Sequence, residues 1–185
     1  MKARSGKSPS NLMARECIVT AMLQLIYKKP MSSITISELT KLAGVSRVTF
    51  YRNYGSKEEV LIEELRELLA RYEAEEPAER RRGIYYDRQH MKRCFQYFYD
   101  HRAFMDGLIY CGFGDIFLRL ITEYIQRKWS DGSSGPEQAY RLAAFSGMLY
   151  NVYSAWVQRG CAQPPEEIAE IMERMCEMGF GAALP

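Results

Sequence analysis

Apolar residues recur at intervals of three or four positions along most of this chain, which is the spacing of a helix with one buried face. All seven prolines fall between the apolar runs, as expected if they separate helices. Strand-like alternation of useful length and hairpin signals are absent from the sequence. The pattern therefore predicts an all-α protein. Its helices are expected to start or resume near Ser10, Thr35, Ser46, Ser56, Met91, Phe117, Pro136 and Pro165.

Local signals set the boundaries of the second, third and fourth helices. Residues 35–38 (TISE) and 56–59 (SKEE) fit the capping box, in which a hydroxyl accepts from the amide three residues on and the Glu side chain reaches back. Gly44 is placed to end the second helix in a left-handed conformation. Ser46 is placed to cap a short third helix. Residues 35–54 therefore predict a helix, a turn and a second short helix.

This arrangement is typical of a helix-turn-helix, whose second helix enters the major groove of DNA. Apolar residues on one side can lock the two helices together, namely Leu39, Ala43, Val45 and Phe50. Hydrogen-bonding side chains lie on the other side: Ser46, Arg47, Thr49, Tyr51, Arg52 and Asn53. An arginine can bind guanine with two hydrogen bonds, and a tyrosine can bind phosphate. An ordinary helical hairpin with a solvated polar face is the alternative.

Charge is unevenly distributed along the chain. Residues 1–60 contain ten Lys and Arg against four Asp and Glu, whereas the remaining residues contain fifteen against nineteen. A basic first third on an acidic body favours contact with a polyanion. A surface that is basic without a partner is the alternative.

The residues of this segment resemble a known family. The matching positions are Leu39, Ala43, Gly44, Val45, Ser46, Thr49, Phe50, Tyr51, Tyr54, Lys57, Glu58 and Leu61. Residues 10–62 look like the DNA-binding domain of the TetR (tetracycline-repressor-like) transcriptional regulators. The resemblance implies a three-helix DNA-binding domain over residues 1–56. It also implies a helical effector-binding and dimerisation domain over residues 57–185, which the long fourth helix links to the first.

The resemblance also implies roles for single residues. Thr35 lies where the family often contacts phosphate, and Tyr51 and Lys57 match an aromatic and a lysine that bind phosphate. Arg47, Val48 and Thr49 would face the bases. The whole expected DNA-binding set is Thr35, Ser46, Arg47, Val48, Thr49, Tyr51, Arg52, Asn53 and Lys57.

The end of the chain is similar to a C-terminal domain common among Firmicutes members of this family. The residues that carry this likeness are Phe145, Gly147, Tyr150, Trp156, Gly160 and the segment 165–168. The likeness implies that the last two helices pair with their copies in a homodimer. A second stripe of small residues on the helix from Pro136 agrees with this, and full burial in a monomeric core is the alternative. The expected interface residues are Ala143, Gly147, Ser154, Ile168, Met172 and Met175.

Aromatic residues crowd the region between Tyr85 and Trp156. Such a set can line a mostly apolar ligand pocket, and core packing is the alternative reading. We expect a small apolar or aromatic effector, because few cationic side chains interrupt these apolar faces. The expected pocket residues are Phe95, Phe98, Tyr99, Phe113, Phe117, Tyr150 and Tyr153.

The composition argues against other functions. Five cysteines form no C-x-x-C pair and only two histidines are present, so we expect no metal and no cofactor. The longest uncharged stretch, 142–158, is shorter than the roughly 20 apolar residues of a membrane span, and no apolar leader follows the basic N-terminus. Phosphate-loop and nucleophile-elbow motifs are absent, so no enzyme is expected. These observations predict a cytoplasmic protein without a membrane partner.

Together the sequence predicts a ligand-responsive repressor that binds a palindromic operator in double-stranded DNA as a homodimer. The alternative keeps the DNA-binding domain but answers to a protein partner. In that case the protein could act as an activator and would have no small-molecule pocket.

Overall fold

The computed structural model describes residues 9–76, 86–130 and 135–180. Within these ranges the chain forms nine α-helices and no strand, which confirms the predicted all-α class. The helices are α1 (Pro9–Ile26), α2 (Ile36–Ala43), α3 (Arg47–Asn53), α4 (Lys57–Ala74), α5 (Arg88–Asp100), α6 (Arg102–Tyr110), α7 (Gly114–Trp129), α8 (Gly135–Gln158) and α9 (Pro165–Phe180). A 3₁₀ turn, η1 (Met31–Ser33), lies between α1 and α2. No described helix is both long and apolar enough to cross a membrane.

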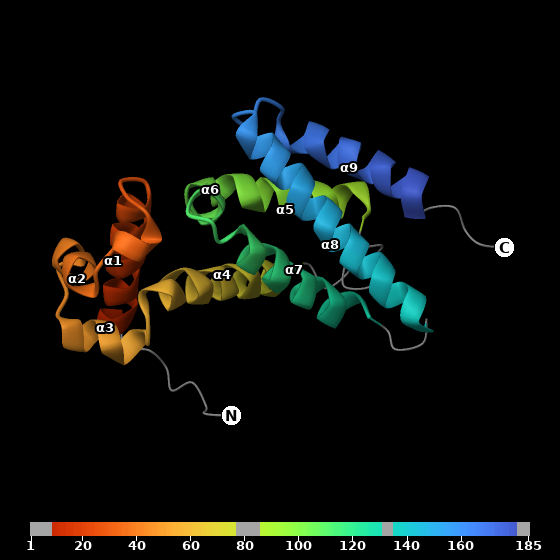
Figure 1. Cartoon of the computed structure of the whole chain (residues 1–185). Coiled ribbons are helices and arrows are strands. Elements are labelled where there is room, and N and C mark those ends of the chain that lie inside the picture. Colours follow the sequence, from red (N-terminus) through yellow and green to blue (C-terminus); the bar gives the residue numbers. More distant parts are fainter. Residues whose placement is uncertain (1–8, 77–85, 131–134, 181–185) are drawn as a thin grey trace.

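Helices α1, α2 and α3 form a small bundle at one end of the molecule (Figure 1). Ile18 and Met22 of α1 are fully buried, as are Leu39 of α2 and Phe50 of α3. These side chains come from three different helices and share one apolar core. Burial of such side chains is the main stabilising contribution to a bundle this small.

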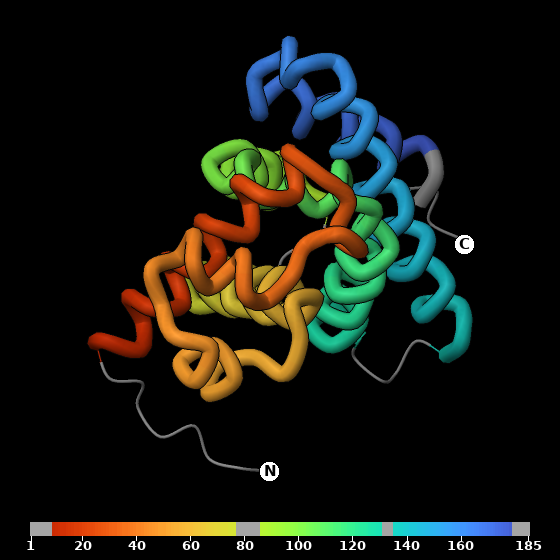
Figure 2. Tube along the Cα trace, turned by 60° about the vertical axis from the view of Figure 1, so that its left-hand side comes forward, coloured from red at the N-terminus to blue at the C-terminus, as the bar shows by residue number. Residues whose placement is uncertain are grey.

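The other helices form a larger body, which α4 enters from the bundle (Figure 1). Within the body α5 packs on α9, and α7 packs on α8. Figure 2 brings the bundle forward and shows α8 and α9 to one side, away from α2 and α3. Phe95, Phe117 and Tyr153 are fully buried where α5, α7 and α8 meet.

The hydroxyl half of each predicted cap forms, whereas Glu59 of the 56–59 box accepts from the Gly55 amide at 2.7 Å and not from Ser56. The hydroxyls of Thr35, Ser46 and Ser56 each accept a hydrogen bond from the backbone amide three residues on, at 3.2, 3.0 and 3.2 Å. Gly44 has φ 66°, a left-handed conformation that costs glycine little and other residues more. The boundaries of α2, α3 and α4 are therefore set by local chemistry that the sequence displays.

Helix α6 brings the body into contact with α1. A Cβ atom added at Gly107 would lie 3.0 Å from Cδ1 of Ile26 and 3.2 Å from Cδ2 of Leu23. Glycine thus allows α6 and α1 to approach more closely than a larger residue would permit. The bundle touches the body here as well as through α4.

Candidate nucleic-acid interface and regulatory region

The α2–turn–α3 unit holds its second helix in a fixed orientation. Leu39 and Phe50 are fully buried between the helices of the bundle. In the turn, the Val45 amide donates to the Thr40 carbonyl at 3.0 Å. The Thr40 hydroxyl is itself buried and donates to the Ile36 carbonyl at 2.9 Å. A rigid turn of this kind keeps the outer face of α3 available for a partner.

The outer face of α3 carries four exposed side chains, Arg47, Val48, Tyr51 and Arg52. Val48 is 69% and Tyr51 52% exposed, so both side chains are accessible to a partner. Neither arginine makes an ion pair within the described part of the chain. Both guanidinium groups therefore remain available to base edges or phosphates.

Other residues of α3 that were expected to contact DNA form hydrogen bonds within the helix. The hydroxyls of Ser46 and Thr49 lie 2.9 Å apart, and Thr49 is half-buried. The Asn53 side-chain amide donates to the Thr49 carbonyl at 2.9 Å. Ser46 and Asn53 thus form hydrogen bonds with the backbone at the two ends of α3. The sequence pattern alone did not distinguish this structural role from contact with DNA.

Thr35 lies exposed at the start of α2. Its hydroxyl oxygen accepts from the Glu38 amide at 3.2 Å, which leaves the hydroxyl proton to donate. The Glu38 carboxylate pairs with Lys29, and this hydrogen bond holds the pKa of Glu38 below its ordinary value. The assignment of Thr35 as a phosphate contact stays a prediction.

Lys57 has a different set of partners from the phosphate that the resemblance implied. Its ammonium donates to the carbonyls of Met31, Ile34 and Ser32 at 2.7, 2.8 and 3.2 Å. An ammonium has three donors, so these bonds occupy all of them. In this structure Lys57 fastens the start of α4 to the η1 turn, and we remove it from the candidate contact set.

Some of the basic side chains of the N-terminal third therefore bind other groups of the protein and are not available to a partner. Arg15 is buried and pairs with Glu67 of α4 at 2.7 Å, and its guanidinium lies over the Tyr54 ring. Among the described residues of the bundle, the basic side chains without an ion pair are Lys28, Lys41, Arg47 and Arg52. Of these, Arg47 and Arg52 lie on α3 and define the candidate polyanion-binding surface.

The aromatic residues predicted to line a pocket lie close together, and most of them pack against one another in the core. Phe98 lies edge-on to Phe95, Phe117 and Tyr153, with ring centroids 5.1–6.4 Å apart. Tyr150 packs edge-on against Phe117 at 5.7 Å. These rings fill the space between α5, α7 and α8 with one another. Tyr99 and Phe113 lie half-buried at the edge of this core.

One polar group enters this core from α6. The Tyr153 hydroxyl donates to Asp106 Oδ1 at 2.9 Å. Partial burial raises the pKa of Asp106, and the bond from Tyr153 opposes that rise. Asp106 lies one residue before Gly107, so this bond links α8 to the segment that touches α1.

The expected dimer residues divide into two groups. Ala143 and Met175 are exposed, and a Cβ atom at Gly147 would meet nothing within 4 Å. Ser154 is half-buried. Ile168 is 6% exposed and Met172 is fully buried within the protomer, where α9 packs on α5. These two were misplaced in the expected interface, because α9 turns their side of the helix inward.

The described residues form no assembled metal site. Across residues 9–76, 86–130 and 135–180, no group of three or more His, Cys, Asp and Glu side chains is placed to hold a metal ion. We therefore assign no ligand set.

A helix-turn-helix with an outward polar face, joined by a long helix to an all-helical body, defines a DNA-binding transcriptional regulator. Residues 18–63 match the family described as bacterial regulatory proteins, tetR family. Residues 88–178 match TetR_C_8, described as a transcriptional regulator C-terminal region. The chain belongs to the TetR family of transcriptional regulators. The narrower likeness to the Firmicutes type stays a prediction.

A curated relative supports this assignment over part of the chain, and a solved structure shares the fold. The HTH-type transcriptional regulator AlkX of Mycobacterium tuberculosis (strain ATCC 25618 / H37Rv) is 35% identical over 49 residues, which is 26% of this chain. The match spans 23% of that relative. A solved structure of the fatty acid degradation regulator FadR from Bacillus halodurans aligns with a TM-score of 0.61 and 16% identity. It covers 98% of this chain and 100% of that one, and it shows a shared fold alone.

Proposed function

We propose that this regulator is a ligand-responsive repressor that binds a near-palindromic operator as a homodimer. The observation that carries the DNA-binding part is the outer face of α3. There Arg47 and Arg52 are exposed and make no ion pair with any residue that the structure describes, and Val48 and Tyr51 beside them are also exposed. An arginine can discriminate guanine, a valine methyl can contact thymine, and a tyrosine can bind phosphate.

The surface of α8 and α9 supports the dimer. Ala143 and Gly147 are small residues one turn apart on α8. On α9, Met175 and Met178 are 43% and 86% exposed. Small residues allow two helices to approach closely, and exposed methionines provide apolar surface for a partner. A two-fold dimer would place two α3 helices on half-sites about 34–36 Å apart, which gives the operator its symmetry.

Contact between α6 and α1 supports control by an effector. Gly107 seats α6 directly on α1, and Asp106 is bonded to Tyr153 in the core of the body. A ligand that favours a different packing of the body would therefore also move the DNA-binding bundle. The size of that response is limited by the difference in ligand affinity between the two states.

The filled aromatic core favours a second candidate. The rings around Phe98 pack against one another, and the cavity that Phe98 lines has a volume of only about 20 Å³. A regulator that answers to a protein partner needs no such opening. The two candidates share the DNA-binding domain, for which we propose residues 1–56, and the body, for which we propose residues 57–185. Neither includes a catalytic step.

Selection of bound duplexes from a random pool tests the DNA-binding proposal. The full chain is incubated with the pool at about 0.15 M salt, and bound DNA is sequenced over several rounds. We expect a consensus with two inverted half-sites. Enrichment of one isolated half-site would remove the dimeric operator, and the absence of any consensus would remove sequence-specific binding.

A further inference from the structure

Arg15 of α1 is a charged residue in the interior of the molecule. Only 7% of it is exposed, and its guanidinium donates to Oε1 of Glu67 on α4 at 2.7 Å. The same guanidinium lies over the ring of Tyr54, with 4.8 Å between its Cζ and the ring centroid. Tyr54 is the residue at which α3 ends. One side chain of α1 therefore contacts both the end of α3 and the middle of α4.

The Tyr54 ring belongs to the core on which α3 rests. It is 2% exposed and lies 5.7 Å from the Phe50 ring of α3, and the Tyr54 amide donates to the Phe50 carbonyl at 2.9 Å. The Tyr54 hydroxyl has no hydrogen-bond partner among the described residues. The ring is therefore held by contacts to its faces and edges, and the Arg15 cation supplies an electrostatic contact on one face.

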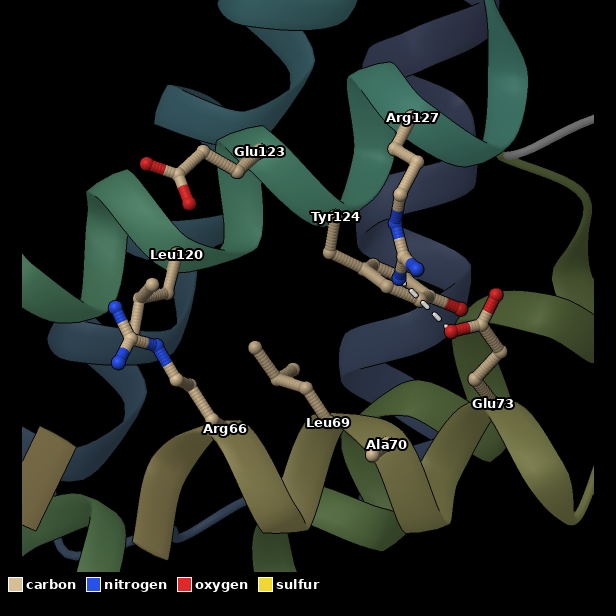
Figure 3. Close-up of a pocket in the computed structure, with 8 residues that line it drawn as sticks. All are labelled: Arg66, Leu69, Ala70, Glu73, Leu120, Glu123, Tyr124 and Arg127. Atoms are coloured by element: carbon tan, nitrogen blue, oxygen red, sulfur yellow. Dashed lines mark hydrogen bonds and ion pairs between the residues drawn. The ribbon is translucent and has the colours of Figure 1, made fainter. Parts of the chain in front are cut away.

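Glu67 lies on the part of α4 that the body holds in place. Leu69, two residues later, points toward α7 and lines the cleft between α4 and α7 together with Tyr124 (Figure 3). Further along α4, Glu73 pairs with Arg127 of α7 at 2.8 Å. The Arg15–Glu67 pair therefore connects the DNA-binding bundle to a segment of α4 whose position is fixed by the body.

Lys57 and Glu67 attach the bundle to α4 at two separate points. Lys57, in the first turn of α4, donates to the backbone carbonyls of residues 31, 32 and 34. Glu67 lies ten positions later, which corresponds to about 15 Å along a helix. Two polar attachments at this separation oppose rotation of the bundle about the start of α4 more strongly than one attachment would.

A buried ion pair contributes to orientation in a way that apolar contacts do not. Replacement of such a pair by apolar side chains of similar volume is often neutral or stabilising, so stability alone does not require Arg15 and Glu67. A hydrogen bond from a planar guanidinium needs a particular distance and direction, whereas apolar side chains in contact can slide past one another at little cost. The Arg15–Glu67 pair therefore restricts how α1, and α3 with it, can turn relative to α4.

We propose that Arg15 is a positioning residue for operator recognition: through Tyr54 and Glu67 it fixes the orientation of α3 relative to α4, and so determines which half-site spacing the protein accepts. In a two-fold dimer any shift of α3 along the operator occurs in both protomers. Base pairs are about 3.4 Å apart, so a shift of about 1.7 Å in each protomer changes the matched spacing by one base pair. This inference rests on the proposed dimeric operator and assigns the residue that sets its spacing.

Binding to a panel of duplexes tests this role. Each duplex carries two inverted copies of the half-site that selection from the random pool gives, with the selected spacer or one shorter or longer by one or two base pairs. A further duplex carries a single half-site. We expect the wild type to prefer one spacer about tenfold over its neighbours, as for a mismatched base pair.

The main variant is Arg15→Met/Glu67→Met, which removes both charges of the pair together. Its melting temperature should equal or exceed that of the wild type, because no charge of the pair is left buried without its partner. Its preference for one spacer should fall to about threefold or less, while its affinity for the single half-site stays within about twofold of the wild type. Circular dichroism confirms that the variant is folded.

Two single variants complete the test. Glu67→Gln is milder, because the amide oxygen can still accept from Arg15 but carries no charge, and it should lower the spacer preference by about half. This variant decides the matter if the double variant does not fold. Arg66→Met is the matched control, since Arg66 precedes Glu67 on α4 but its 2.6 Å pair with Glu63 stays within the helix. It should keep the wild-type preference.

The outcomes separate positioning from stability and from the proposed function. A spacer preference equal to that of the wild type in the folded variants would overturn the role of Arg15. Equal weakening on every duplex, the single half-site included, would overturn it too, because it would show a contribution to folding alone. A wild-type protein that binds every spacer and the single half-site equally would instead contradict the dimeric operator, and this inference with it.

Discussion

The ammonium of Lys57 donates to the backbone carbonyl of Met31 at 2.7 Å, and thereby joins the first turn of α4 to the η1 turn before α2. The carbonyls of Ser32 and Ile34 accept from the same ammonium. Three backbone carbonyls therefore converge on one positive charge. A position that the family resemblance marks as a phosphate contact therefore fastens the η1 turn to α4 in this structure.

Replacement of Lys57 by methionine should lower the free energy of unfolding. Methionine keeps most of the apolar stem but cannot donate, so we expect a loss of about 2 kcal/mol from three charge-assisted hydrogen bonds. Urea unfolding of wild type and variant measures this loss. The salt dependence of operator binding should keep its slope. A slope lower by about one, with unchanged stability, would return Lys57 to the phosphate contacts.

Removal of the Arg47 side chain should weaken operator binding and relax specificity at one base pair. Arg47 is exposed at the start of α3, and a bidentate contact to guanine contributes about 1–3 kcal/mol of discrimination. Titrations of Arg47→Ala with operator and single-site operator variants measure both effects. Arg66→Ala is the charge-matched control, because Arg66 lies on the body and pairs with Glu63. Equal losses in both variants would indicate a general charge effect.

Substitutions at Gly147 test whether this face of α8 forms the dimer interface. A Cβ atom there meets nothing within 4 Å, so the protomer has room for a larger side chain. Gly147→Arg should dissociate the proposed dimer, because the long charged side chain would enter a close helix contact. Analytical ultracentrifugation at several concentrations gives the mass. Gly147→Ala is the smaller control and should remain dimeric. A Gly147→Arg dimer as tight as wild type would place the interface elsewhere.

The parts of the fold that the sequence predicts well are those set by neighbouring residues. Thr35 and Ser46 cap helices because a hydroxyl and an amide three residues apart meet by geometry alone. Gly44 adopts the left-handed conformation for a similarly local reason. By contrast, the break between α5 and α6 at His101 carries no proline or glycine, and the sequence pattern predicted no separate start for α6.

The parts that the sequence misses depend on contacts between distant segments. Lys57 binds carbonyls more than twenty residues earlier, which a motif cannot reveal. Met172 faces α5 because of how α9 docks, so its place in a regular apolar stripe does not decide between core and interface. A cavity of about 20 Å³ in the body likewise has Leu69 of α4 and Tyr124 of α7 in its wall, two residues far apart in the sequence. The aromatic content of the sequence indicates this region but does not predict the cavity within it.

Acidification should destabilise the protein through His90. The imidazole is 8% exposed, with the rings of Tyr72 and Trp129 edge-on to it. Burial lowers the pKa of His90 to about 4 in the folded state, against 6.5 for an unperturbed histidine. Between these values the unfolded chain binds a proton that the folded protein excludes, so the free energy of unfolding falls as pH falls.

The effect is absent above about pH 6.5 and complete below about pH 4, and between pH 7.5 and pH 5 it should reach about 2 kcal/mol. Chemical unfolding of wild type and His90→Gln at both pH values measures it, because the variant lacks the titrating group while all others remain. The difference in stability between the two proteins should shift in favour of the variant at pH 5. An unchanged difference would mean that the folded protein accepts a proton at His90 as readily as the unfolded chain does. That result would require water or a carboxylate such as Glu76, whose Oε1 lies 3.7 Å from Nδ1, to offset the burial.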